Sequence, residues 1–315
     1  MARRAALCLA LGATLTLGLA CSLGSAPRTP GFGPVDVLVF APHPDDEVIG
    51  AGGVLQQALA EGKTVGIVFA TNGDGYPEAA SALFSKPIAT LTHADYLSLG
   101  ATRQREAIAA GQILGVRASS LVFLGYPDAA LACVYADVST APVESPFTGR
   151  TSTYGPAQAD FHTLAHGSPA PYTRAAALAD VEEIVRESAP RQVYVTDRAD
   201  QHPDHSATFD LVRDATTAVG FTGALRTYLV HSGPGLEWPW PVGPTPQAAF
   251  ESHAVGGATY PLGVTWPPPV RVPVTSAQSA LKLRALAAHA SQWDLPLDRV
   301  FLESFVKAEE VFWTA

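Results

Sequence analysis

The stretch Val37-Leu38-Val39-Phe40-Ala41-Pro42-His43-Pro44-Asp45-Asp46-Glu47 decides the fold of this 315-residue chain. Its first five residues are apolar, which is typical of a short strand buried on both faces. The residues that follow place one imidazole and three carboxylates at the end of that strand, where unpaired charge costs free energy. Ligands of open α/β sheets bind at the carboxyl ends of parallel strands. The stretch therefore predicts both a buried parallel strand and a functional site at its end.

Strand and helix signals alternate along the rest of the chain, which predicts an α/β fold with a Rossmann-like, mostly parallel sheet and helices on both faces. The expected strands are residues 35–41, 64–70, 120–124 and 192–196, and the expected helices are residues 47–62, 95–114, 173–187 and 276–291 together with a helix after His205. Three glycines early in the first helix, Gly50, Gly52 and Gly53, predict a close approach to the sheet or to a substrate.

Two irregular insertions interrupt the predicted single domain, at residues 129–171 and 232–269. Both are rich in Pro and Gly and are longer than ordinary connections in a compact domain. The first is expected to be a lid or a substrate-binding insertion. The second contains Trp238, Trp240 and Trp266, which can stack on sugar faces or simply pack within the loop.

The N-terminus is typical of an export signal, since Arg3 and Arg4 precede sixteen uncharged residues that end before Cys21. Residues 1–21 are expected to be a signal peptide, residues 22–34 a linker and residues 35–315 the folded domain. The segment around Cys21 resembles the lipobox of bacterial lipoproteins, and plain secretion is the alternative. The sequence thus predicts an exported protein, either secreted or held at the cell envelope, with membrane attachment only through lipid on Cys21.

Composition narrows the function classes further. The formal net charge is −9, and an acidic surface argues against nucleic acid and against an anionic membrane face as partners. Beyond the signal peptide and Cys21 the only cysteine is Cys133, so no disulfide framework can hold the domain. We expect a hydrophobic core or a metal to stabilise it.

A second cluster, His202-Pro203-Asp204-His205, follows another predicted strand about 160 residues after the first. His43 and Asp46 can face one point from the strand exit, and His205 can reach it from the other strand. Three protein ligands with an open fourth position are typical of catalytic zinc. The sequence predicts one Zn²⁺ per chain, bound by His43, Asp46 and His205, although iron or cobalt could use the same ligands.

A metal hydrolase also needs a base and a group that stabilises the oxyanion. Asp45 lies between two predicted ligands and can accept a proton from a metal-bound water. His202 can donate a proton or a hydrogen bond to the oxyanion, and Asp204 is expected to orient His202. Taken singly, an acidic residue at a helix start is more often a cap.

These motifs resemble those of the PIG-L/LmbE-like zinc-dependent deacetylases, which remove acetyl groups from molecules that contain N-acetylglucosamine. The resemblance implies that His43, Asp46 and His205 bind zinc, that Asp45 is the general base and that His202 assists at the oxyanion. It extends from about Val35 to Gln292.

The resemblance also adds two substrate-binding residues. Arg103-Gln104-Arg105-Glu106-Ala107 is similar to a family helix whose arginine faces the substrate, here Arg103, and Leu124-Gly125-Tyr126-Pro127-Asp128 is similar to a segment whose aspartate contacts a sugar hydroxyl, here Asp128. Surface and capping roles are the alternatives for these two residues. The segment from Lys282 to Gln292 is similar to the C-terminal helix of the family.

We therefore expect an exported zinc-dependent hydrolase that removes an N-acetyl group from an amino sugar or a glycoconjugate. One alternative is a zinc amidase or esterase that acts on a non-sugar acyl substrate. Another is a carbohydrate-binding protein without turnover. Histidines outside the two motifs, His231 among them, are expected to have packing or surface roles, and His289 is expected to be a helix residue near the site and not a ligand.

Overall fold

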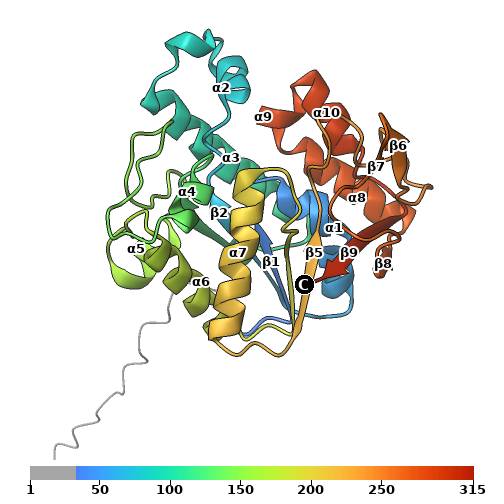
Figure 1. The fold of residues 1–315 in the computed structure, drawn as a ribbon, viewed down its shortest axis with the longest axis horizontal. Helices are drawn as coiled ribbons and strands as arrows, with labels where there is room; N and C mark the ends of the chain where they lie inside the picture. Colours follow the sequence, from blue (N-terminus) through green and yellow to red (C-terminus); the bar gives the residue numbers. More distant parts are fainter. Residues whose placement is uncertain (1–32) are drawn as a thin grey trace, which may run out of the picture.

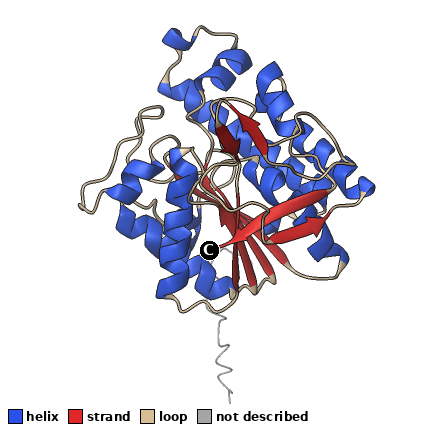
Figure 2. Cartoon of the chain, turned by 45° about the vertical axis from the view of Figure 1, so that its right-hand side comes forward, coloured by secondary structure: helices blue, strands red, loops and turns tan. Residues whose placement is uncertain are grey.

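A computed structural model describes residues 33–315, so the predicted signal peptide and nearly all of the predicted linker, Cys21 included, lie outside the described residues. Seven strands form the central sheet, in the order β3-β2-β1-β4-β5-β9-β8 (Figures 1 and 2). Their bounds are β1 Val37–Ala41, β2 Val65–Thr71, β3 Leu121–Tyr126, β4 Gln192–Thr196, β5 Ala224–Tyr228, β8 Val270–Pro273 and β9 Glu309–Thr314. The five strands from β3 to β5 are parallel, and β9 and β8 extend the sheet in antiparallel fashion.

Helices cover both faces of the sheet (Figure 2), as the alternation of the sequence predicts. One face packs against α1, α3, α8 and α10, and the other against α4, α5, α6 and α7. The helix bounds are α1 Asp46–Ala60, α2 Pro77–Phe84, α3 His93–Leu114, α4 Leu131–Ala136, α5 Phe161–His166, α6 Arg174–Ser188, α7 Pro203–Ala218, α8 Ser276–Ala287, α9 Ala290–Trp293 and α10 Pro296–Glu303, with short 3₁₀ turns at Ile88–Thr90 and Ala118–Ser120. The single α/β domain of the prediction is confirmed.

The order of the strands fixes where a ligand binds. The chain leaves β1 toward β2 and β3 on one side, and it returns to β4 and β5 on the other side of β1. Loops that leave neighbouring strands in opposite directions open a crevice at the carboxyl ends of those strands. The two histidine motifs follow β1 and β4, so the topology brings them together at this crevice.

The predicted close approach of the first helix is made by Gly50. A Cβ atom on this residue would lie 2.3 Å from the ring of Tyr228 on β5, which is far inside van der Waals contact. Any larger residue would push α1 away from the sheet. Because α1 begins at Asp46, such a shift would also displace the motif that precedes it.

The two insertions contain secondary structure, and the first differs from the lid or substrate-binding insertion that the sequence predicts. The first contains α4 and α5, and the second contains the hairpin β6 (His253–Val255) and β7 (Ala258–Tyr260). Of both insertions only Ala129 lines the cavity described below. Trp238 is 1% exposed, and its indole donates to the carbonyl oxygen of Leu229. This tryptophan therefore packs in the core, so the sugar-stacking alternative is wrong for it.

Several elements are absent from the sequence-based prediction. The strands β5, β8 and β9 and the helices α2 and α10 were not expected, and the predicted helix 276–291 is divided into α8 and α9. Strand β5 (Ala-Leu-Arg-Thr-Tyr) has no clear alternation, and β9 begins with two glutamates, so neither carries a strong strand pattern. None of the helices in residues 33–315 has both the length and the apolar character that crossing a bilayer requires.

Candidate active site

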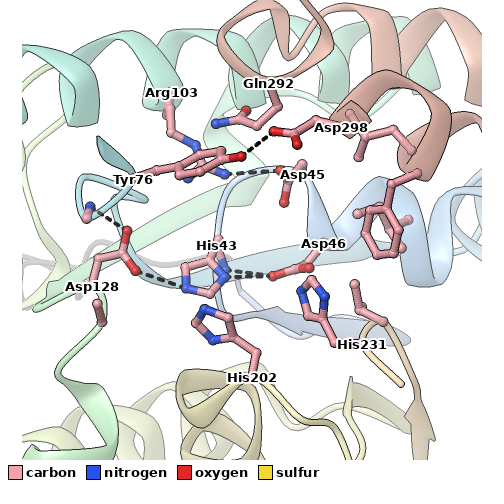
Figure 3. Close-up of a pocket in the computed structure, with 16 residues that line it drawn as sticks. His43, Asp45, Asp46, Tyr76, Arg103, Asp128, His202, His231, Gln292 and Asp298 are labelled. Carbon is pink, nitrogen blue, oxygen red and sulfur yellow. Dashed lines mark hydrogen bonds and ion pairs between the residues drawn. The ribbon is translucent and has the colours of Figure 1, made fainter. Parts of the chain in front are cut away.

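A cavity of about 300 Å³ opens at the carboxyl ends of β1 and β4 (Figure 3). Its lining residues come from both histidine motifs, from the segment before α2, from the segment that follows β5, and from α9 and α10. It contains most of the residues that the sequence singled out: His43, Asp45, Asp46, Arg103, Asp128 and His202. His205 and Asp204 are fully buried behind them.

Three side-chain atoms converge behind this cavity. His43 Nδ1 lies 3.2 Å from Asp46 Oδ2 and 3.1 Å from His205 Nε2, and His205 Nε2 lies 3.3 Å from Asp46 Oδ2. Ligands about 2.0–2.1 Å from a tetrahedral zinc ion are separated by about 3.3 Å. The triangle therefore has the dimensions of one face of a zinc coordination sphere, and its two nitrogens and one oxygen suit that metal.

The far nitrogen of each histidine lies against a carboxylate. His43 Nε2 lies 3.1 Å from Asp128 Oδ1, and His205 Nδ1 lies 3.2 Å from Asp200 Oδ2. Carboxylates in this position orient metal-binding imidazoles and fix which ring nitrogen faces the metal. Asp200 was not predicted, although it stands only two residues before the second motif. Its other contacts, with the backbone N–H groups of His202 and Val230, hold it in place.

The electrostatics of the triangle favour a cation. Burial disfavours a charged imidazole, yet the carboxylates of Asp200 and Asp46 outweigh it and raise the pKa of His205 to about 10. Two carboxylates beside this fully buried ring thus attract positive charge strongly. The residues present fit a divalent metal on the grounds of both geometry and charge.

Asp45 lies in a strained turn between the strand and α1. Its φ of 131° lies in a region that favours glycine, and strain of this kind costs about 1–3 kcal/mol and concentrates at functional sites. The backbone N–H of Asp45 donates to Glu47 Oε2 at 2.9 Å. Burial raises the pKa of Asp45 to about 7, with Arg103 opposing and Asp46 reinforcing the shift. A carboxylate with such a pKa is suited to proton transfer near neutral pH.

Glu47 supports this turn from inside the protein. It is fully buried, and its Oε1 lies 3.4 Å from Nε2 of the equally buried His289. These contacts hold the Asp45 turn from behind, and His289 lies at the N-terminal end of α9 behind the site.

Arg103, the predicted substrate-binding arginine, lines the cavity and also contacts the turn that carries Asp45. Its guanidinium donates from Nη1 to the carbonyl of Gly73 and from Nη2 to the carbonyl of Pro44 and to Asp45 Oδ2. A Cβ atom on Gly73, whose φ is +65°, would lie 2.4 Å from this guanidinium. The side chain is 4% exposed. Arg103 therefore holds the Pro44–Asp45 turn in place and also forms part of the cavity wall (Figure 3).

The structure also corrects the position expected for Asp204. Its carboxylate accepts from the backbone N–H groups of Ala129 and Leu131 and lies 3.5 Å from His43 Nε2. It is the backbone N–H of Asp204 that reaches His202, donating to Nδ1 at 3.3 Å. This contact assigns the proton of a neutral His202 ring to Nε2. Burial lowers the pKa of His202 to about 2, so the ring is neutral.

The other wall of the cavity is formed by residues that sequence reasoning missed. Tyr76 and Asp298 meet across it, with the phenol donating to Asp298 Oδ2 at 2.7 Å (Figure 3). His231 stacks on Phe301, with ring centroids 5.3 Å apart. Gln292 Nε2 is buried without a protein partner. His231 directly follows the apolar residues Leu229 and Val230, a pattern that could have marked it as a residue just past a strand. Because β5 was not predicted, this position was not recognised from the sequence.

Comparison with known proteins identifies the family. A family model described as PIG-L, GlcNAc-PI de-N-acetylase, matches residues 38–216, which is more than half of the chain and contains both histidine motifs. The chain belongs to the PIG-L family. As a member of this family it is a hydrolase of the deacetylase type. No curated protein matches the sequence.

Solved structures show the same fold. The PIG-L chain is similar to the N,N'-diacetylchitobiose deacetylase from Pyrococcus horikoshii, at 20% identity and a TM-score of 0.52 over 91% of this chain and 86% of that one. It is also similar to the A40926 pseudoaglycone deacetylase Dbv21, at 19% identity and a TM-score of 0.52 over 89% and 96%. A third relative in fold is the 4-carboxy-2-hydroxymuconate hydratase GalB from Pseudomonas putida, at 17% identity and a TM-score of 0.50 over 86% and 82%.

Proposed function

We propose that this PIG-L family member is a zinc-dependent hydrolase that releases acetate from an N-acetylated amino sugar of the N-acetylglucosamine type. The observation that carries the proposal is the triangle of His43 Nδ1, Asp46 Oδ2 and His205 Nε2 behind the cavity. These three residues would hold one zinc ion. Zinc supplies a Lewis acid that polarises a carbonyl oxygen and makes water more acidic.

The remaining steps belong to side chains of the chain itself. Asp45 accepts a proton from the attacking water, while Arg103 and the contact with Glu47 hold its carboxylate and backbone in position. The water oxygen bonds to the acetyl carbon, and His202 donates from Nε2 to the developing oxyanion. The C–N bond then breaks, and the proton taken by Asp45 passes to the amine that leaves. The products are acetate and a free amino sugar.

The charge of the cavity favours an uncharged substrate. Asp45, Asp46, Asp128 and Asp298 line it, and among the described residues its only lysine or arginine is Arg103. The terminal nitrogens of Arg103 already donate to protein oxygens, one of them on the carboxylate of Asp45, so carboxylates outnumber the cationic side chains of the cavity and offset the charge of Arg103. Carboxylates and the free amide of Gln292 instead suit sugar hydroxyls and the acetamido group. The proposed substrate class is therefore neutral N-acetylated sugars.

A panel assay tests the proposal. Acetate release is measured with the zinc-loaded protein on N-acetylglucosamine oligosaccharides, the 6-phosphate of N-acetylglucosamine, N-acetylated peptides and acetyl esters. We expect release from the neutral sugars, with the phosphorylated sugar and the non-sugars much slower. Release confined to peptides or esters would replace the sugar substrate by another acyl compound. Sugar binding without acetate release would favour the binding-protein alternative.

The reaction needs a direct test because the fold of this chain is also the fold of a hydratase. Export, with lipid on Cys21 as the anchor, is part of the proposal and rests on the N-terminal sequence alone. The mass of the mature N-terminal peptide distinguishes a lipidated Cys21 from a simple signal cleavage.

A further inference from the structure

A second group of metal-ligating side chains lies away from the cavity, between the insertion and the body of the domain. His162 and His166 are four residues apart on α5, and Asp180 and Glu183 are three residues apart on α6. Residues at these spacings share one face of a helix. His162 Nδ1 lies 2.7 Å from Asp180 Oδ1, and His166 Nε2 lies 3.0 Å from Glu183 Oε2. Helix α5, which belongs to the insertion, lies beside α6 (Figure 1).

Three of these side chains, His162, His166 and Asp180, converge on one volume, and Glu183 contacts His166 beside them. The two imidazole centroids are 4.4 Å apart, and single ligand atoms of His162, His166 and Asp180 all lie within 4.8 Å of one another. Two imidazoles and two carboxylates are a ligand set that zinc accepts. Contact between one imidazole and one carboxylate is common in proteins, whereas two such pairs brought together from two helices form a candidate coordination sphere.

The group is held in position before any ion binds. Asp180 is 1% exposed, and its second oxygen accepts from the hydroxyl of the fully buried Tyr126 on β3 at 2.7 Å. The helix α5 begins at a cap in which Asp160 accepts from the backbone N–H of Thr163, and Phe161 anchors α5 in the core. His166 is more open, with 41% of its side chain exposed. An ion can therefore enter from solvent without rearrangement of the core.

The carboxylates of Asp180 and Glu183 also favour a bound cation between the two helices. The structure pairs neither Asp180 nor Glu183 with a lysine or arginine among residues 33–315, and the nearby Arg186 contacts Glu182 instead. Within the described residues the ion-pair partners of these two carboxylates are the two imidazoles, His162 for Asp180 and His166 for Glu183. A divalent ion bound between the two helices would place positive charge beside both carboxylates.

The geometry points to a second zinc site, formed by His162, His166 and Asp180 with Glu183 beside them, that fastens the insertion helix α5 to α6. On binding, the ion takes the place of the proton between His162 Nδ1 and Asp180 Oδ1, and that proton leaves to solvent. The site is structural, since it lies outside the cavity and touches none of the residues placed in the reaction. The first insertion thereby has a structural role, whereas only its residue Ala129 lines the cavity of the proposed reaction.

Zinc stoichiometry of the full chain tests this site. After chelation and reloading with zinc, we expect two ions per wild-type chain, one in the His162→Ala/His166→Ala variant and one in His205→Ala. A matched pair of histidine substitutions outside both sites, His93→Ala/His253→Ala, should keep two. Zinc should also raise the unfolding temperature of His205→Ala and lose that effect when His162→Ala/His166→Ala is added.

One zinc per wild-type chain, lost entirely in His205→Ala, would overturn the inference and leave only an ion-paired contact between helices. If His162→Ala/His166→Ala fails to fold by circular dichroism, the single variant His166→Gln at the exposed position replaces it. That variant should bind the second ion at least tenfold more weakly, and unchanged binding would also overturn the inference. The stoichiometry does not depend on acetate release, so a failure of the proposed function leaves this test intact.

Discussion

The two walls of the cavity come from different parts of the chain, and they differ in how their polar side chains are held in place. The wall that carries His43, Asp46 and His202 comes from loops after β1 and β4, within the part of the chain that the family model matches. The opposite wall comes from the segment after β5, from α9 and from α10, all beyond that match, together with Tyr76. We refer to them as the metal wall and the substrate wall. The first lies wholly within the range of the family model, whereas most of the second lies outside it.

The hydrogen bonding of the two walls differs in the same way. On the metal wall each proposed histidine ligand has a carboxylate behind it, and Arg103 holds the turn that carries Asp45. On the substrate wall Gln292 Nε2 has no protein partner. The metal wall also has buried atoms without a hydrogen-bond partner, among them His43 Nε2 and Arg103 Nε, but its imidazoles are held by the neighbouring carboxylates. Among the described residues no carboxylate holds the amide nitrogen of Gln292 in this way, and a buried donor of this kind is costly until a ligand satisfies it. The comparison assigns the reaction to the metal wall and the choice of substrate to the substrate wall.

The largest expected effect comes from removing a ligand on the metal wall. His205→Ala should lose the cavity zinc and reduce acetate release to background, because only two of the three ligands remain. Asp45→Asn should keep that zinc and lose about 10²- to 10⁴-fold in kcat, the usual contribution of a general base. Zinc content and acetate release are measured on the same samples. Zinc loss in Asp45→Asn, or full activity in His205→Ala, would break the assignment of roles.

A smaller effect is expected from the residue behind a ligand. Asp200→Asn should weaken zinc binding in the cavity by about 10- to 100-fold, since it removes the charge that orients and polarises His205. Competition with a metal chelator measures this change. Asp197→Asn is the matched control, because Asp197 lies in the same loop but bonds to Thr227 and the backbone of Ala199. Equal zinc affinities for the two variants would contradict the role given to Asp200.

A substitution on the substrate wall should raise KM and leave kcat nearly unchanged. Gln292→Leu removes the free donor at similar size, and the loss of one hydrogen bond of about 0.5–1.5 kcal/mol predicts a KM roughly 2- to 13-fold higher at a nearly constant kcat. Steady-state acetate release gives both constants. The control Gln57→Leu alters a glutamine on the exposed side of α1 that bonds to Pro273. A fall in kcat with unchanged KM for Gln292→Leu would place this residue on the metal wall instead.

The smallest effect concerns the strained turn. Because Asp45 has a φ of 131°, Asp45→Gly should be more stable than Asp45→Ala by about 1 kcal/mol, although both lose activity. Thermal unfolding measures the difference. The same two substitutions at Asp294, an exposed helix end with a φ of −77°, should give the opposite order, since glycine only adds unfolded-state entropy there. Asp45→Ala as stable as Asp45→Gly would show that the turn is not strained.

The division between the walls also explains what the sequence could predict. The residues His43, Asp46 and His205 stand in short motifs after apolar strands, and parallel strands bring such ends together whatever else the fold contains. The orientation of Arg103 could not be predicted, because it depends on the distance between α3 and the Pro44–Asp45 turn. Residues Tyr76 and Asp298 are 222 residues apart in the chain and meet through the packing of α2 against α9 and of α9 against α10, and no local pattern encodes that contact.

A zinc titration tests the central claim most directly. The His162→Ala/His166→Ala variant is stripped with a chelator and titrated with zinc, while acetate release from a neutral N-acetylglucosamine oligosaccharide is followed. The account predicts no release without metal and a linear rise that ends at one zinc per chain. Release that survives chelation, or that zinc does not restore, would contradict a metal wall built on His43, Asp46 and His205.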